Sequence, residues 1–232
     1  MKIITVIPAR GNSKSIKNKN IKLLNNFPLI KYSIEYSLLS KAINKTIVST
    51  ESKKIAKIAN KYGADTPFLR NKKLSQDEIQ DFPVMIDALL KSEEFYGIKF
   101  DLLVILRPTS PLRPKGLIEK SLSLLKKNPQ ATSVRAVTYS NQHPFRQWKK
   151  NGNYISSFII GAPDESYNIP RQKLPLSLWQ TGDIEVVRRK TLVNGSVTGN
   201  RVLPLIINNE DVFDIDTMDD LNKAKKAMKN NN

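Results

Sequence analysis

The chain has 232 residues, no cysteine, and a formal net charge of +17 from 38 basic and 21 acidic residues. This length suffices for a single α/β domain with a large core, and the missing cysteines exclude disulfides and thiolate metal sites. The longest strongly apolar run, residues 102–106, is too short to span a membrane. Because Met1 leads straight into the first expected strand, we expect no signal peptide, no membrane partner and a cytoplasmic protein.

The high positive charge suggests nucleic acid as a partner. The lysines, however, are spread along the chain among asparagines, and the few aromatic residues do not interleave with them as stacking platforms would. We therefore expect no nucleic-acid partner. A non-catalytic basic nucleic-acid-binding protein is kept as an alternative. An affinity for DNA or RNA that falls steeply with salt concentration would support it.

A buried strand followed by a basic loop opens the chain. Residues 2–7 form a short β-branched run that ends before Pro8, which cannot continue a central strand. A positive φ at Gly11 would turn successive backbone N–H groups toward an anion. The loop therefore predicts a phosphate site, with a solvated Lys/Asn loop as the alternative. The side chains that would surround the anion are those of Arg10, Ser13, Lys14, Lys19 and Asn20.

Strands and helices alternate through the first half of the chain. The apolar spacing predicts strands at 2–7, 45–50, 65–70 and 101–106, and helices at 28–40, 52–62, 80–95 and 115–127. Such alternation implies βαβ units and a mainly parallel sheet. Three prolines in the segment 107–114 exclude helix and strand there, so a stiff loop follows the strand 101–106.

From residue 131 onward, strands follow one another without intervening helices. The pattern predicts strands at 131–139, 154–160, 178–188 and 201–207, with an Asn151-Gly152 turn. We expect an excursion from the βαβ core at about 138–180. His143 is the only histidine, so it can form neither a histidine metal site nor a nucleophilic dyad, and a structural hydrogen-bonding role is expected.

Two aspartates precede the expected last helix at 218–228. In extended backbone, Asp214 and Asp216 share one face while Ile215 points toward the core. Opposite a basic phosphate loop, two such carboxylates predict a Mg²⁺ site. The alternative is that Asp216 or Thr217 caps the helix, and Asp216 could serve both roles.

Several stretches of the chain together resemble the CMP-sialic acid synthetases (N-acylneuraminate cytidylyltransferases) and the related KDO cytidylyltransferases. They are P-A-R-G-N-S-K-x4-K-N at 8–20, R-P-T-S-P-L-R at 107–113, H-P-F-R at 143–146, P-R-Q at 170–172, and F-D-I-D at 213–216. The resemblance runs from near residue 3 to near residue 226. It implies a Rossmann-like three-layer α/β sandwich, a single domain over 1–232, with the excursion forming dimer contacts.

The resemblance also implies an activity. A homodimer would transfer CMP from CTP to the anomeric hydroxyl of a 2-keto sugar acid, with Mg²⁺ as cofactor and pyrophosphate as the second product. No general base is evident from the sequence. A family-A-like glycosyltransferase is a second alternative, although its D-x-D usually falls in the middle of the chain and not before a C-terminal helix.

The matched motifs assign roles to particular residues of this chain. Catalysis is assigned to Lys19, Arg10 and Asp214, and the metal to Asp214 and Asp216. Nucleotide binding is assigned to Arg10, Gly11, Ser13, Lys14, Lys19, Asn20, Arg70, Asp77, Pro108 and Ser110. Sugar binding is assigned to Arg107, Arg146, Arg171, Gln172 and Trp179, with Arg146 and Arg171 facing the sugar carboxylate. Arg107 and Trp179 depart from the Gln and Arg typical of the sialic acid enzymes, so a different preferred sugar is expected.

Overall fold

A six-stranded sheet forms the centre of the protein, whose computed structural model describes residues 1–13 and 15–230. Its strand order is β10-β6-β9-β5-β1-β4. Pairings that involve β9 are antiparallel, and the others in this sheet are parallel. The strands are β1 (Ile3–Pro8), β4 (Lys45–Ser49), β5 (Leu102–Ile105), β6 (Ser133–Tyr139), β9 (Leu178–Arg188) and β10 (Val202–Ile206).

Helices cover both faces of this sheet. Successive side chains of a strand point to opposite faces, so Ile3 and Ile7 of β1 pack in one core cluster with α1, α2 and α4, whereas Ile4 and Val6 pack in another with α3 and α5. The predicted three-layer α/β sandwich with a mainly parallel sheet is thereby confirmed. The helices are α1 (Leu29–Leu38), α2 (Lys53–Lys61), α3 (Asp81–Tyr96), α4 (Leu117–Lys127), α5 (Arg189–Val193) and α6 (Met218–Asn230).

A third, smaller core cluster attaches the last helix to the opening segment. Leu221 and Ala224 of α6 pack with Ile16 and Leu24, close to the short hairpin of β2 (Leu23–Leu24) and β3 (Phe27–Pro28). The C-terminal helix therefore lies beside the loop that follows β1. This packing brings the aspartates before α6 near the basic loop, although some 200 residues separate them.

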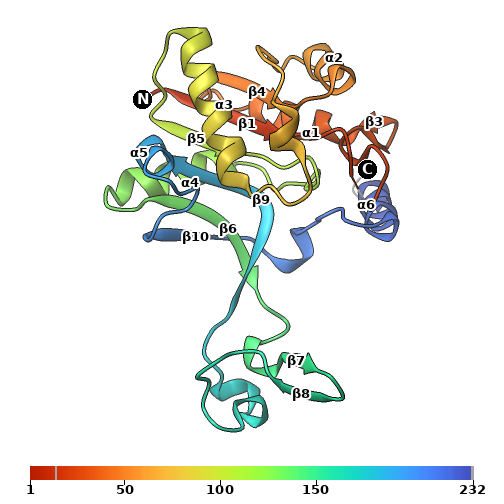
Figure 1. Cartoon of the computed structure of the whole chain (residues 1–232), viewed down its shortest axis with the longest axis vertical. Helices are drawn as coiled ribbons and strands as arrows, with labels where there is room; N and C mark the ends of the chain where they lie inside the picture. The colour runs from red at the N-terminus through yellow and green to blue at the C-terminus, as the bar shows by residue number, and fades with distance from the viewer. Residues whose placement is uncertain (14, 231–232) are drawn as a thin grey trace.

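The chain leaves the main body after β6 and returns at β9. Figure 1 shows this excursion hanging below the sheet on two extended segments, with the hairpin of β7 (Trp148–Asn151) and β8 (Tyr154–Ser157) at its far end. Large apolar side chains on it are exposed, among them Tyr154 and Ile160. The excursion starts at the carboxyl edge of the parallel strands, where the basic loop also lies.

One predicted strand is wrong. Residues 65–70 make a single parallel bridge between Asp65 and Ile47 of the edge strand β4, and the chain then leaves the sheet. Pro67 follows two residues later and has no N–H to donate to a ladder, which explains the early end. None of the helices within residues 1–13 and 15–230 is long and apolar enough to cross a membrane.

Candidate active site

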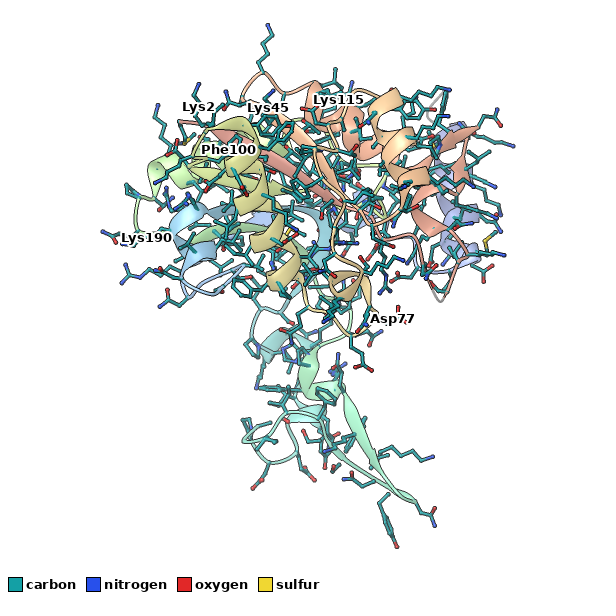
Figure 2. The ribbon with its side chains drawn as sticks, turned by 45° about the horizontal axis from the view of Figure 1, so that its top comes forward. Lys2, Lys45, Asp77, Phe100, Lys115 and Lys190 are labelled. Atoms are coloured by element: carbon teal, nitrogen blue, oxygen red, sulfur yellow. The ribbon has the colours of Figure 1, made fainter. Side chains whose placement is uncertain are left out.

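A cavity of about 510 Å³ opens at the carboxyl ends of β1 and β5. In open α/β sheets this edge is where ligands bind, because the loops that follow the strands converge there. Figure 2 shows Asp77, one of the lining residues, on the side of the body from which the excursion hangs. The cavity is lined by Pro8, Arg10, Ser13, Ser15, Lys19, Asn20, Arg70, Leu74, Gln76, Asp77, Ile79, Asp81, Val84, Arg107, Pro108, Thr109 and Asp216.

The basic loop after β1 supplies two cations to this cavity. Arg10 forms an ion pair of 2.8 Å with Asp77, and the Lys19 ammonium lies 2.8 Å from Asp216. The Asn20 side chain is buried and donates a hydrogen bond to the Arg10 carbonyl, which fixes the start of the loop. Ser13 lines the cavity as expected, whereas Lys14 lies outside the described residues.

Gly11 does not form the expected anion nest. Its backbone is not in the left-handed region, and its N–H donates to Glu51 Oε1 at 2.7 Å. A Cβ at this position would lie 3.1 Å from that same oxygen and 3.3 Å from the Ser52 Cβ. A side chain here would therefore crowd Glu51 and Ser52, and the expectation of a positive φ was wrong.

Glu51 is a residue that the sequence reasoning missed. It accepts the Gly11 N–H and forms an ion pair of 3.3 Å with the buried Arg70, so it joins the loop to β4. Burial of the Glu51 carboxyl acts to raise its pKa, but hydrogen bonds from Gly11 and Ser75 and the charge of Arg70 outweigh it and leave the pKa below its usual value. Arg70 lines the cavity, yet it is already neutralised by a protein carboxylate.

Arg107, at the end of β5, forms part of the opposite wall. Its guanidinium pairs with Glu185 of β9 and with Asp81 at the start of α3. Burial alone would lower the pKa of Arg107, but the two carboxylates raise it above its usual value, so the side chain is a permanent cation. Asp81 and Glu185 were not predicted. A single carboxylate inside the apolar run I-E-V-V is the sequence signal that points to Glu185.

Hydrogen bonds from a buried arginine fix the loop after β5. Arg113 donates to the carbonyl oxygens of Arg107 and Asp183 and to the Ser33 hydroxyl. Burial lowers the pKa of Arg113 to about 10 even though Asp183 lies nearby. Pro108 lines the cavity, but Ser110 is fully buried against Gly182 and does not reach it.

Ile215 is buried between Asp214 and Asp216, as the alternation along extended backbone predicts. Asp216 lines the cavity, whereas Asp214 is not among its lining residues. Partial burial of its carboxyl group raises the pKa of Asp214; a hydrogen bond from Thr109 counteracts this, and the neighbouring charge of Asp216 raises it further. The negative charge of Asp216 thus disfavours the charged form of Asp214, and a divalent cation near both carboxylates would relieve this repulsion. No cluster of three or more acidic, histidine or cysteine ligands occurs within the described chain, but Mg²⁺ commonly takes one or two carboxylates together with substrate phosphates.

Thr217, not Asp216, caps the last helix. The Thr217 hydroxyl accepts the Asp220 N–H at 3.2 Å, and the Asp220 carboxylate accepts the Thr217 N–H at 2.9 Å, which is a reciprocal capping box. The Asp216 carboxylate instead receives Lys19. The expectation that Asp216 serves both roles was therefore wrong. Its side chain faces the cavity and does not cap the helix.

The arginines of the excursion lie apart from this cavity within one chain. Arg146 and Arg171 line a separate cavity of about 270 Å³ with His143, whose Nε2 lies 3.0 Å from the Pro175 carbonyl and whose Nδ1 accepts the Phe145 N–H. The structural role expected for His143 is confirmed. Trp179, on the part of β9 that enters the excursion, is 62% exposed, and Gln172 is exposed as well.

A mainly parallel sheet, with a basic loop at its carboxyl edge and Asp216 paired to Lys19 of that loop, indicates an α/β nucleotidyltransferase. Residues 4–153 match the cytidylyltransferase family. The chain belongs to that family.

Two similar proteins cover nearly the whole chain. It is 33% identical over 240 residues to post-translational flagellin modification protein B of Campylobacter coli, covering 99% of this chain and 96% of that protein. It is 32% identical to the CMP-N,N'-diacetyllegionaminic acid synthase of Legionella pneumophila, covering 100% and 98%. The fold matches a solved CMP:2-keto-3-deoxy-manno-octonic acid synthetase in complex with CTP, with a TM-score of 0.74 at 17% identity and full coverage of both chains.

Proposed function

We propose that this cytidylyltransferase transfers CMP from CTP to the anomeric hydroxyl of a 2-keto sugar acid, releasing pyrophosphate. The observation that carries the proposal is the placement of Arg10, Lys19 and Asp216 around one cavity at the carboxyl edge of the sheet, where Lys19 lies 2.8 Å from Asp216. Similarity over almost the whole chain to a CMP-nonulosonic acid synthase supports the choice of acceptor. Family membership favours nucleotidyl transfer over a glycosyltransferase or a nucleic-acid binder, and a cytoplasmic location stays a prediction.

The nucleotide would occupy the half of the cavity formed by the basic loop. Arg10, Ser13 and Lys19 line it and are assigned to the triphosphate, with Asn20 holding the loop backbone. Lys19 is assigned to the departing phosphates. Such a transfer needs little covalent chemistry from the protein, because positioning and stabilisation of the developing charge supply most of the rate. Arg70 and Asp77 complete this half, and Lys14 and Gly11 are assigned to it by motif alone.

Asp214 and Asp216 would hold Mg²⁺. When bound, the ion would supply positive charge that offsets the negative charge of the triphosphate and of the departing pyrophosphate. In the free protein the Asp216 carboxylate pairs with Lys19 at 2.8 Å. A metal bound to Asp216 and a phosphate bound to Lys19 would each replace this ion pair. If Asp216 held the metal, Lys19 would be free to bind a phosphate.

The acceptor would lie between the β5 loop and the excursion. Arg107 and Pro108 line the cavity there, and Trp179 stands exposed where β9 leaves the body. Arg146, Arg171 and Gln172 of the same chain lie in the excursion, so we assign them to the acceptor of the partner subunit in a homodimer. Exposed apolar side chains on the excursion, such as Ile160 and Leu176, support such a contact.

Release of pyrophosphate from CTP, measured with a panel of acceptors, tests the proposed function. We expect turnover that needs both a divalent cation and a 2-keto sugar acid, with legionaminic-type, sialic, pseudaminic and KDO-type acids as the panel. Lys19→Gln should lower turnover strongly, whereas Lys22→Gln, an exposed lysine outside the cavity, should not. Equal turnover of ATP or GTP, or use of a neutral aldose 1-phosphate as acceptor, would contradict the proposal.

A further inference from the structure

The loop after β5 contains a tight turn at the wall of the cavity. The Ser110 N–H donates to the Arg107 carbonyl at 3.2 Å, which closes a four-residue turn with Pro108 and Thr109 at its centre. Proline suits the first central position of such a turn, because its fixed φ matches that position. The same Arg107 carbonyl accepts a hydrogen bond from the buried Arg113. The turn is therefore fixed in place by the protein interior.

Thr109 contacts the segment before α6 through both its backbone and its side chain. Its carbonyl oxygen accepts the Ile215 N–H at 2.8 Å, and its hydroxyl donates a hydrogen bond to the Asp214 carboxylate. Ile215 is fully buried, so the segment is anchored in the core at the same point. Thr109 also lines the cavity, as does Asp216. One residue of the turn thus joins both aspartates to the cavity wall.

The neighbouring hydroxyl of Ser110 makes no comparable contact. It is fully buried, does not line the cavity, and has no hydrogen-bond partner among residues 1–13 and 15–230. The motif assigned Ser110 to the site and left Thr109 out, because two adjacent hydroxyl residues cannot be told apart by type. The structure distinguishes them, since the Thr109 hydroxyl reaches a carboxylate and the Ser110 hydroxyl does not.

A hydroxyl that donates to a carboxylate prepares it for a metal in two ways. It stabilises the charged form of the carboxylate, which is the form that binds a cation. It also selects one orientation of a group whose terminal torsion is otherwise broad, and Asp214 is exposed, so few other contacts restrict it. Hydrogen bonds of this kind to metal ligands contribute to metal affinity although their donors do not touch the ion.

We propose that Thr109 is a positioning residue for the metal: its hydroxyl orients the Asp214 carboxylate, and its carbonyl holds the segment 214–216 against the turn after β5. This inference rests on the proposed function, in which Asp214 and Asp216 hold Mg²⁺. Pro108 of the same turn lines the cavity on the side assigned to the acceptor. Thr109 therefore joins the metal site and the acceptor wall into one rigid unit.

Binding of Mn²⁺ in place of Mg²⁺ tests the proposal without turnover. CTP is present and the acceptor is left out, so no transfer takes place, and water-proton relaxation distinguishes Mn²⁺ bound with CTP to the protein from Mn²⁺ bound to CTP alone. Thr109→Val removes the hydroxyl and keeps the carbonyl, so it should weaken Mn²⁺ binding about 10- to 100-fold. Thr109→Ser keeps a hydroxyl and should restore most of the affinity. The KM for CTP at saturating metal should change little in either variant.

Thr217→Val is the matched control. It is the same substitution next to Asp216, but the Thr217 hydroxyl bonds Asp220 and neither of the two aspartates assigned to the metal. This variant should lose stability and keep its affinity for Mn²⁺. Unchanged Mn²⁺ binding in Thr109→Val would overturn the proposal. Equal weakening in Thr109→Val and Thr217→Val would also overturn it, because it would indicate a general disturbance of the segment.

A double variant shows whether Thr109 acts through Asp214. Asp214→Asn removes the charged ligand, so the Thr109 hydroxyl no longer has a carboxylate to orient. In this background Thr109→Val should weaken Mn²⁺ binding further by less than about twofold, as expected for two residues that contribute to one interaction. If Thr109→Val has its full effect in the Asp214→Asn background, Thr109 acts elsewhere and the inference is wrong.

The two proposals fail in different ways. An Asp214→Asn variant that binds Mn²⁺ as tightly as the wild type contradicts the metal site of the proposed function. Weakened Mn²⁺ binding in Asp214→Asn together with normal binding in Thr109→Val contradicts only the present inference.

Discussion

At the scale of single residues, Asp214 is expected to serve catalysis at a cost in stability. Its raised pKa means that the folded state disfavours the charged carboxylate, so Asp214→Asn should leave the metal-free melting temperature at pH 7.5 unchanged or higher. Turnover with Mg²⁺ should fall at least about 100-fold. Loss of a residue that only hydrogen-bonds a metal ligand already lowers activity by up to about that factor. Parallel measurement of the melting temperature and of pyrophosphate release checks both effects.

Thr217 provides the contrasting variant, because it caps α6 and faces no substrate group. Thr217→Val should cost about 1 kcal/mol of stability and leave turnover nearly intact. A Thr217 variant that loses turnover at full stability, or an Asp214→Asn enzyme with normal Mg²⁺-dependent turnover, would contradict this division between the two neighbouring residues.

Glu51 is expected to make the stability of the protein depend on pH. Because its folded-state pKa lies below the usual value near 4.5, it contributes stability that is fully present above that value and is lost as the pH falls through the folded-state pKa. Glu51→Gln still accepts the Gly11 N–H but no longer titrates. Its melting temperature should therefore fall less steeply than that of the wild type below about pH 4.5, as thermal scans from pH 3 to 7 would show. If the melting temperatures of both proteins fell equally steeply below about pH 4.5, the role assigned to Glu51 would be refuted.

At the scale of elements, β9 must approach the β5 loop closely. A Cβ on Gly182 would lie 2.7 Å from the buried Ser110 hydroxyl and 3.7 Å from the Asp214 carboxylate. Gly182→Ala should therefore push these groups apart, at about 1–3 kcal/mol of stability for an overpacked site, and weaken the metal dependence of turnover. Gly182→Ala combined with Ser110→Ala, which removes the hydroxyl in the way, should recover much of the loss. Failure of that rescue would contradict the steric explanation.

At the scale of the whole molecule, the excursion is expected to join two copies of the chain. Ile160 is 99% exposed and Leu176 76% exposed, although both are strongly apolar. Ile160→Asp should therefore shift the protein from dimer to monomer in light scattering while the main body keeps its melting temperature. If arginines of the partner complete the acceptor site, the monomer should also show a higher KM for the acid. A wild type that is monomeric at micromolar concentration would contradict the proposal.

Local pattern determined most of the fold. Apolar periodicity correctly placed the strands of the sheet and all α-helices but the short α5, because each of these elements buries an apolar face in one of three core clusters. It failed at residues 65–70, where a short segment with Phe68 and Leu69 runs beside the edge strand and Pro67 ends the pairing after one bridge. Propensity alone cannot distinguish a strand from an extended segment that makes one bridge to an edge strand and then leaves the sheet.

The residue types of the site can be predicted from the motif 8–20, the loop 107–114 and the aspartates before the last helix. How their charges pair is visible in the three-dimensional structure alone. Glu51 takes the Gly11 N–H, Asp216 takes Lys19, and Glu185 and Asp81 share Arg107. These partners come from elements up to 197 residues apart, so no local spacing reveals them. The physical reason is that an ion pair depends on distance in space, which the sheet order sets and the sequence pattern does not.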